Sequence, residues 1–215
     1  MALIRDADKD TIKLEFEKMR NNVKILVFTS EENCDYCKET LEIVNELKDL
    51  GNKISLETYD LTKNRDVAEK YGVDKAPAIV LEAGEKRAKF FGIPAGYEFT
   101  TLVEDIVEIS YEKPELHEKT RALLKNVDRD VHIMVFVTPT CPYCPAAVRI
   151  AHKFAFENPK ISAEMIEASE FPDLAEKYGV FSVPKVVINN DVEFEGALPE
   201  EHFAEHVLLA IGKNI

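Results

Sequence analysis

The four cysteines of this 215-residue chain form two Cys-x-x-Cys motifs, Cys34 with Cys37 and Cys141 with Cys144. Two thiols at this spacing can form a disulfide that exchanges electrons with a partner, or they can bind a metal. Because the motifs use every cysteine, none remains for a structural framework of disulfides. Redox or metal chemistry is therefore the expected use of these thiols.

An internal repeat carries the two motifs. The hexapeptide Ala-Glu-Lys-Tyr-Gly-Val occurs at residues 68–73 and again at 175–180, and a proline follows each copy, Pro77 and Pro184. Cysteines, hexapeptides and prolines all keep an offset of 107 residues. Each copy thus has roughly 100 residues, a usual size for a small domain. We expect two tandem units, residues 1-112 and 113-215.

Apolar periodicity predicts the same order of elements in both units, with each thiol pair at the turn from a strand into a helix. The first unit is expected to contain a helix with Ile12, Phe16 and Met19 on one face, strand 23–28, a helix from the thiols to a Gly51 cap, strand 54–59, helix 63–70, strands 78–81 and 87–91, and helix 97–109. The second is expected to contain a helix with Leu116, Leu123, Leu124 and Val127 inward, strand 131–137, helix 142–156, strand 161–166, helix 173–178, strands 185–188 and 193–195, and a helix with Phe203, Val207, Leu208 and Ile211 inward. This order predicts an α/β fold with a four-stranded mixed sheet and helices on both faces in each unit.

Position within each turn suggests a role for each cysteine. Unpaired N–H groups and the dipole at a helix N-terminus stabilise a thiolate, so Cys34 and Cys141 are the expected nucleophiles. Cys37 and Cys144 lie one helical turn further on, where they can attack a mixed disulfide and release the product. Pro142 suits the first helical position, where its missing N–H would have no helical partner.

The repeated prolines suggest a second component of each site. A cis peptide bond before Pro77 or Pro184 would turn the backbone of Ala76 or Val183 toward the thiols. There it could pair with an extended segment of substrate by strand addition. Main-chain pairing reads no side chains, which suits an enzyme with many protein substrates.

The residues around the thiols predict two unequal sites. Tyr36 and Tyr143, inside the motifs, are expected to shape the substrate surface, with ordinary side-chain packing as the alternative. Four acids lie near Cys34 in the sequence, and no acid lies close to Cys141; the four are Glu31, Glu32, Asp35 and Glu39. Nearby negative charge disfavours a thiolate, so Cys141 is expected to be the more reactive nucleophile.

Metal binding explains these features less well. The pairs of a zinc ribbon lie roughly 15 to 20 residues apart, and such a site would not need the repeated prolines. A bridged iron–sulfur cluster is not expected, because each site keeps its second cysteine. His202 and His206 stand one helical turn apart, but their helix face also holds Glu201 and Glu205 and is expected to be solvated. We expect no metal and no cofactor beyond the two redox-active disulfides, and we expect the acidic run 104–112 to be solvated surface.

Composition limits the classes of partner. A net charge of −13 would repel nucleic acid and an anionic membrane surface, so neither is an expected partner. The chain begins without the apolar core of a signal peptide, and no apolar stretch approaches the length of a membrane span. These features predict a cytoplasmic protein. A charged fraction of 31% without Gln or Trp is typical of a heat-adapted one.

The motifs resemble those of a known family. A Cys-x-x-Cys at a strand-to-helix turn, with an X-Pro ahead of a later strand, resembles the thioredoxin fold, and Cys141-Pro142-Tyr143-Cys144 matches the active-site tetrapeptide typical of glutaredoxins. Two such units, each with a leading helix, resemble the protein disulfide oxidoreductases of hyperthermophilic archaea and bacteria, which are similar to a minimal protein disulfide isomerase. Two features depart from the pattern. Phe28 and Val135 stand near the position where thioredoxins usually carry a buried acid, and the first tetrapeptide, Cys-Asp-Tyr-Cys, is less typical.

The resemblance implies two active sites in one polypeptide, reduced by a flavin-dependent thioredoxin reductase. The predicted activity is dithiol–disulfide exchange, by which the enzyme reduces, forms or isomerises disulfides in protein substrates. The alternative from another class is a chaperone-like or scaffold module in which the thiols are vestigial.

Overall fold

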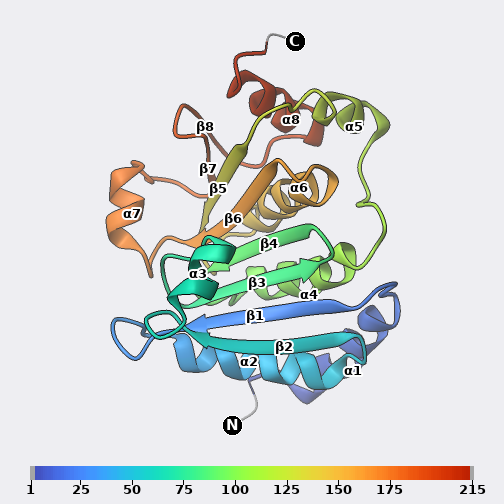
Figure 1. Cartoon of the computed structure of the whole chain (residues 1–215), viewed down its shortest axis with the longest axis vertical. Helices are drawn as coiled ribbons and strands as arrows, with labels where there is room; N and C mark the ends of the chain where they lie inside the picture. Colours follow the sequence, from blue (N-terminus) through green and yellow to red (C-terminus); the bar gives the residue numbers. More distant parts are fainter. Residues whose placement is uncertain (1–2, 214–215) are drawn as a thin grey trace.

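A single eight-stranded mixed sheet runs through the molecule (Figure 1), with the strand order β2-β1-β3-β4-β6-β5-β7-β8. The structure is a computed structural model that describes residues 3–213. The first unit consists of α1 (Asp6–Glu17), β1 (Val23–Thr29), α2 (Cys37–Leu50), β2 (Ile54–Asp60), α3 (Arg65–Tyr71), β3 (Ala78–Ala83), β4 (Lys86–Phe91) and α4 (Tyr97–Ile109). The second unit consists of α5 (Glu118–Leu124), β5 (Val131–Val137), α6 (Cys144–Glu157), β6 (Ile161–Glu167), α7 (Pro172–Lys177), β7 (Lys185–Ile188), β8 (Val192–Glu195) and α8 (Glu200–Leu209).

Both units have the predicted order of elements, and the bounds of α4, β5 and β7 agree with the prediction. The largest difference is at α5, which spans only Glu118–Leu124 and so leaves Leu116 ahead of the helix and Val127 beyond it, although Val127 is buried as expected. A second difference lies at the thiols of the second unit. There α6 begins at Cys144, so the expectation that Pro142 occupies the first helical position is wrong. Pro142 lies in the preceding turn, and Pro145 is the proline within the first helical turn.

The predicted end of the second helix at Gly51 is confirmed, but this glycine does not have the left-handed conformation common at helix ends. Gly51 is extended, with φ −120° and ψ 121°, rather than left-handed. The reason for a glycine is packing, because a Cβ at this position would lie 2.6 Å from Cδ1 of Ile54 and 3.0 Å from the ring of Phe16. A side chain at residue 51 would therefore separate α1 from the start of β2.

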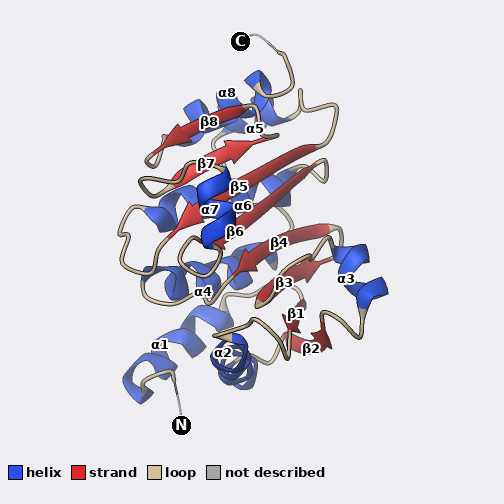
Figure 2. Cartoon of the chain, turned by 90° about the vertical axis from the view of Figure 1, so that its left-hand side faces the viewer, coloured by secondary structure: helices blue, strands red, loops and turns tan. Residues whose placement is uncertain are grey.

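Helices cover both faces of the sheet, as predicted. Short helices α3 and α7 lie on one face, where Phe28 and Phe136 are buried, and the other helices pack on the opposite face (Figures 1 and 2). Central strands β1 and β5 are apolar on both sides, and Ile25 and Val135 are fully buried. This burial explains why both strands read as continuous apolar runs rather than as an alternating pattern.

The two four-stranded sheets are not separate, which the sequence did not predict. Strand β4 pairs in parallel with β6, with Lys89, Phe90 and Phe91 in register with residues 164–166 (Figure 2). Beside this junction Lys89 Nζ lies 2.8 Å from Oε1 of Glu164, and Nε2 of His132 lies 3.0 Å from the same oxygen. Burial alone would raise the pKa of Glu164, but His132 and Lys89 lower it to about 2. The junction therefore contains a compensated buried carboxylate.

Helices α4 and α6 form the second contact between the units, and they overturn the expectation that the acidic run 104–112 is solvated. Asp105 is fully buried, and its Oδ2 lies 2.6 Å from Nδ1 of His152. Glu108 is also buried and lies 3.9 Å from Nζ of Lys153, while Glu104 pairs with Arg149 at 2.6 Å. The sequence argument failed because the partners of these acids lie in the other unit.

The start of α4 holds a less usual acid, Glu98. Its side chain is only 1% exposed, and neither carboxylate oxygen has a hydrogen-bond partner among the described residues. The pKa of Glu98 is raised to about 7, chiefly by burial and also by the charge of Asp105, while the nearby hydroxyl of Thr101 acts in the opposite sense. The folded protein therefore favours the neutral carboxylic acid form of Glu98 over the carboxylate.

None of the helices in residues 3–213 is long and apolar enough to cross a membrane. The same residues contain no group of three or more His, Cys, Asp or Glu side chains arranged to hold a metal ion.

We predict that Glu98→Gln changes the pH dependence of folding. The pKa of Glu98 is raised in the folded state, so its contribution to stability is present below about pH 4.5 and is lost as pH rises through about 7. Between pH 5 and pH 8 the variant should gain up to about 3 kcal/mol in free energy of unfolding relative to the wild type. Urea denaturation at both pH values measures this, and Glu112→Gln, an exposed acid, is the control. Equal pH dependence in Glu98→Gln and wild type would contradict the assignment.

Candidate active sites

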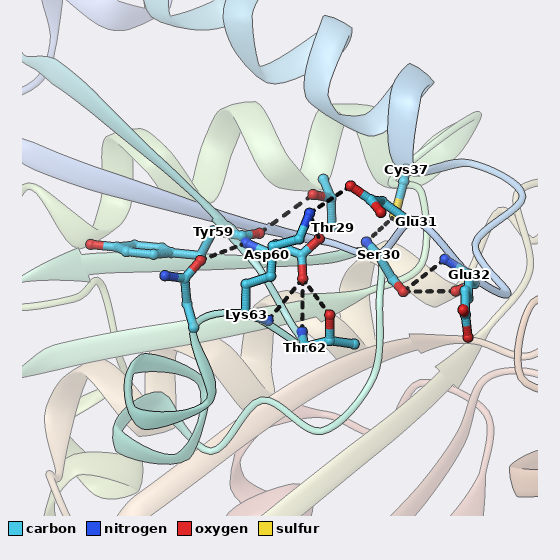
Figure 3. Close-up of polar contacts among 10 residues, drawn as sticks. Thr29, Ser30, Glu31, Glu32, Cys37, Tyr59, Asp60, Thr62 and Lys63 are labelled. Carbon is cyan, nitrogen blue, oxygen red and sulfur yellow. Dashed lines mark hydrogen bonds and ion pairs between the residues drawn. The ribbon is translucent and has the colours of Figure 1, made fainter.

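The first disulfide joins Cys34 and Cys37 at the turn between β1 and α2. Cys37 is buried at the first position of the helix, and Cys34 is half-buried. The backbone N–H of Ser30, at the end of β1, donates a hydrogen bond to Sγ of Cys37 at 3.2 Å (Figure 3). Cys34, the cysteine that the spacing predicts as the nucleophile, is thus the more accessible of the pair.

The second disulfide joins Cys141 and Cys144 between β5 and α6. The backbone N–H of Cys144 donates a hydrogen bond to Sγ of Cys141 at 3.1 Å. A helix N–H aimed at this sulfur stabilises negative charge on it, which is the electrostatic condition for a thiolate nucleophile. Cys144 itself is fully buried, so the second sulfur of the pair is again the more enclosed.

Both predicted prolines lie with the thiols. The Ala76–Pro77 and Val183–Pro184 peptide bonds are both cis. The carbonyl oxygen of Val183 lies 3.6 Å from Sγ of Cys141. In the first unit, Ala76 and Pro77 line the same cleft as Cys34. The fold therefore brings each X-Pro pair to its thiols across about 40 residues of sequence.

The two tyrosines differ in their surroundings. Tyr36 lines the cleft at Cys34 and is 45% exposed. Tyr143 is 71% exposed. Beside the second proline, Phe181 is 95% exposed, whereas the equivalent residue of the first unit is Asp74. The surface around the second site is thus more apolar than the surface around the first.

The two sites open at the same edge of the sheet. Strands β1 and β5 run parallel to each other, because β1 is antiparallel to β3, β3 is antiparallel to β4, and β4 is parallel to β6 and β5. Both thiol turns follow the carboxyl ends of these strands. Four strand spacings of about 4.8 Å separate them, or roughly 19 Å across the sheet.

The acids near Cys34 are partly neutralised in the fold. Nζ of Lys63 lies 2.6 Å from Oε1 of Glu31 (Figure 3). Sequence reasoning missed two other acids at this site, Glu167 and Glu170, which the second unit contributes to the cleft over Cys34. The repeat offered a weak signal for the first of them, since Glu167 occupies the position equivalent to Asp60. Nothing in the sequence placed it beside the other unit's thiols.

Comparison with known proteins agrees with this geometry. A model of the thioredoxin domain matches residues 21–104 and 131–209, one match in each unit. A crystal structure of a protein disulfide oxidoreductase from Aeropyrum pernix is 35% identical and superimposes with a TM-score of 0.89, covering 98% of this chain and 95% of that one. The chain belongs to the protein disulfide oxidoreductase family. It is a thiol–disulfide oxidoreductase with two thioredoxin domains and a Cys-x-x-Cys site in each.

The tandem arrangement of the family also occurs inside larger proteins. A domain of alkyl hydroperoxide reductase AhpF from Enterococcus faecalis is 26% identical, with a TM-score of 0.86, and the match covers 95% of this chain and 99% of that one. A protein of Bacillus subtilis named NADH dehydrogenase is 26% identical over 191 residues, which are 88% of this oxidoreductase and 35% of the relative. The chain spans about a third of the length of the curated relatives that it matches.

We predict that the two nucleophiles of this oxidoreductase titrate differently. Cys141 receives the N–H of Cys144, and no acid lies close to it in sequence, so its thiolate should form at lower pH than that of Cys34. Alkylation of the reduced protein with limiting iodoacetamide across a pH series, followed by peptide mapping, gives a rate midpoint for each cysteine. The midpoint is the informative quantity, because Cys34 is more exposed and its maximal rate also reflects access. Equal or reversed midpoints would overturn the ranking.

Proposed function

We propose that the enzyme catalyses dithiol–disulfide exchange in protein substrates, with Cys34 and Cys141 as nucleophiles and Cys37 and Cys144 as resolving cysteines. The observation that carries the proposal is the N–H of Cys144 aimed at Sγ of Cys141, with the carbonyl of Val183 beside the same sulfur. An acceptor for backbone hydrogen bonds next to a nucleophilic sulfur suits an extended polypeptide.

The exchange balances without a further cofactor. A thiolate attacks one sulfur of the substrate disulfide, a mixed disulfide forms, and the other substrate sulfur leaves as a thiolate that takes a proton from solvent. The resolving cysteine loses its proton and attacks the mixed disulfide. The substrate then leaves with both thiols reduced, and the enzyme keeps the two-electron oxidised pair. The reverse sequence oxidises a substrate dithiol.

The substrate surface that we propose consists of Tyr36, Ala76 and Pro77 at the first site and Tyr143, Val183 and Pro184 at the second. The backbone of Ala76 and Val183 would pair with substrate, and the tyrosines would contact its side chains. Support comes from the lining of the cleft at Cys34 and from the exposure of Tyr143. We also propose that the domain boundary lies between residues 112 and 113, in the segment that separates α4 from α5.

We further propose that a flavoprotein reductase of the thioredoxin reductase type supplies electrons to the disulfides. Support comes from the alkyl hydroperoxide reductases and the proteins named NADH dehydrogenase, in which a segment like this chain is joined to a longer polypeptide. A cytoplasmic location is part of the same proposal, because the chain keeps all of its cysteines for exchange and none for structural bridges.

We predict that the wild type accelerates the reduction of insulin by dithiothreitol and that a variant with Ser at all four cysteines loses all of this acceleration. Turbidity from the released insulin chains measures the rate. A chaperone-like or scaffold function predicts that the two proteins behave alike, so the comparison also decides between the two classes of function.

We predict that Cys37→Ser and Cys144→Ser trap substrate. Each variant keeps a nucleophile but lacks the thiol that resolves the mixed disulfide, so adducts should accumulate at Cys34 or Cys141. Mass spectrometry after incubation with a peptide disulfide locates the adduct. The matched controls are Cys34→Ser and Cys141→Ser, which should form far less adduct in the same unit because the remaining cysteine is the more buried of its pair. Equal adduct yields in the resolving-cysteine variants and in these controls would contradict the division of roles.

A further inference from the structure

A cleft of about 670 Å³ lies at the first site, between the two units. The first unit contributes to its lining Asn33, Cys34, Asp35, Tyr36, Ala76, Pro77, Ile93 and Ala95. The second unit contributes Pro139, Glu167, Ser169, Glu170 and Pro172. Among the described residues the lining contains three acids and no Lys, Arg or His, so the walls beside the Cys34–Cys37 disulfide carry charge of one sign.

Glu167 gives the cleft an acceptor that the protein leaves unused. The residue ends β6 and is only 3% exposed. One carboxylate oxygen accepts the N–H of Glu170 at 2.8 Å, and the other has no hydrogen-bond partner among residues 3–213. A buried carboxylate oxygen without a donor is unfavourable. A donor that entered the cleft would satisfy it.

The equivalent residue of the first unit shows that this unused acceptor is not a property of the repeat. Asp60 ends β2, and its Oδ1 accepts the hydroxyl of Thr62 at 2.7 Å and the N–H groups of Thr62 and Lys63 at 2.9 Å (Figure 3). The pKa of Asp60 is lowered, first by the Thr62 hydroxyl and then by the Lys63 N–H. The loop after β2 therefore satisfies its own acid, whereas the loop after β6 satisfies only one oxygen of Glu167 and leaves the other, on a residue that lines the cleft, without a donor among the described residues.

The junction of the sheets brings Glu167 to the first site. Gly92 directly follows the part of β4 that pairs with β6. Its backbone lies so close to Glu167 that a Cβ on residue 92 would be 2.6 Å from Cβ of Glu167. The N–H of Gly92 donates to the carbonyl of Pro77 at 2.9 Å, which ties this backbone to the proline of the first site. Next along the chain, the N–H of Ile93 donates to Oε1 of Glu170 at 2.6 Å.

Glu170 adds a second poorly compensated carboxylate. The pKa of Glu170 is raised to about 7, chiefly by burial and also by the charges of Glu167 and Asp35, while the N–H of Ile93 acts in the opposite sense. Every charged side chain that acts on Glu170 is therefore negative. A cation in the cleft would reverse this repulsion and favour the ionised form.

We propose that this cleft binds the side chain of a Lys or Arg next to the reacting cysteine of a polypeptide, so that the first site selects basic segments. The proposal rests on the proposed function, since it names the substrate class of one of its two sites. A side chain on a substrate is the favoured occupant because the cleft adjoins Cys34 and Pro77, where the polypeptide must lie during exchange. A bound metal ion is not favoured, because the described residues contain no group of three ligands with suitable geometry.

In the described part of the chain, the strand that supplies this acidic wall has no counterpart at the second site. In the first unit the outer strand β4 pairs with β6 of the second unit. Its equivalent in the second unit, β8, is the last strand of the sheet and has no further strand beside it. The large apolar side chains exposed beside Cys141 and Pro184 are Tyr143 and Phe181. The second site is thus a natural internal control for charge selection.

The test uses two single-site proteins. Cys141→Ser with Cys144→Ser leaves the first site, and Cys34→Ser with Cys37→Ser leaves the second. The probes are three peptides that differ only in Lys, Ala or Glu beside one cysteine, which carries 2-thiopyridine as a mixed disulfide. Attack of a reduced site on the peptide sulfur releases 2-thiopyridone, and stopped-flow absorbance gives the second-order rate constant. The ratio of the Lys to the Glu peptide removes effects of thiolate population that both peptides share.

For the first-site protein we expect the Lys peptide to react about tenfold faster than the Glu peptide, because close opposite charges favour formation of the productive complex. The second-site protein should give a much smaller ratio, which measures the effect of the net charge of −13. The ratio at the first site should fall with added salt and rise from pH 6 to pH 8 as Glu170 ionises. Equal ratios at the two sites would overturn the proposal.

Glu170→Gln and Glu167→Gln, made in the first-site protein, should lower the ratio toward that of the second site. Glu176→Gln removes an exposed acid of α7 outside the cleft and should leave the ratio unchanged. Asp35→Asn changes an exposed residue of the cleft lining and therefore serves as a second test if Glu167→Gln does not fold. A ratio that Glu170→Gln and Asp35→Asn leave unchanged would also overturn the proposal. No reaction of either site with the Ala peptide would instead refute the proposed function, and with it this inference.

Discussion

The parallel pairing of β4 with β6 is the contact on which the rest of the molecule depends. Edge strands expose unpaired N–H and C=O groups, and pairing two edges removes them from solvent. In this chain the pairing converts two small sheets into one of eight strands. The pairing also places both thiol turns at the same end of the strands, because β4, β6 and β5 are then parallel to one another.

Helices α4 and α6 reinforce this junction with polar side chains. Asp105 and His152 form a fully buried polar contact, and Arg149 forms an ion pair with the more exposed Glu104. Buried polar pairs add little net stability, but breaking one of them leaves an uncompensated group in a low-dielectric interior. Such pairs therefore favour one relative placement of the two units over others. Glu98, at the start of α4, lies in the same helix but has no hydrogen-bond partner among the described residues.

The same junction makes the two active sites different. Each unit has a disulfide at a strand-to-helix turn and a cis X-Pro pair beside it. Among the described residues, the first site borders acids of the other unit, whereas the first unit meets the loop of the second site through the N–H of Tyr97, which donates to the carbonyl of Pro139. Glu167 and Glu170 consequently face Cys34, whereas Tyr143 and Phe181 stand exposed around the second site. Duplicated sequences thus acquire different chemical surroundings from their position in the fold alone.

The sequence by itself determined the repeat, the order of elements and the residues of both disulfides, because these depend on spacing and on apolar periodicity within short segments. The helix 97–109 and the strand 131–137 agree with the structure at both ends. The helix end at Gly51 is confirmed, although packing against Ile54 explains the glycine, and the solvated acidic run failed because Asp105 packs against His152 of the other unit. Only the tertiary structure decided the joining of the sheets and the acids over Cys34. The physical reason is that β4 and β6 meet through backbone hydrogen bonds, which carry no side-chain signature, and the side chains that this meeting brings together lie more than 70 residues apart.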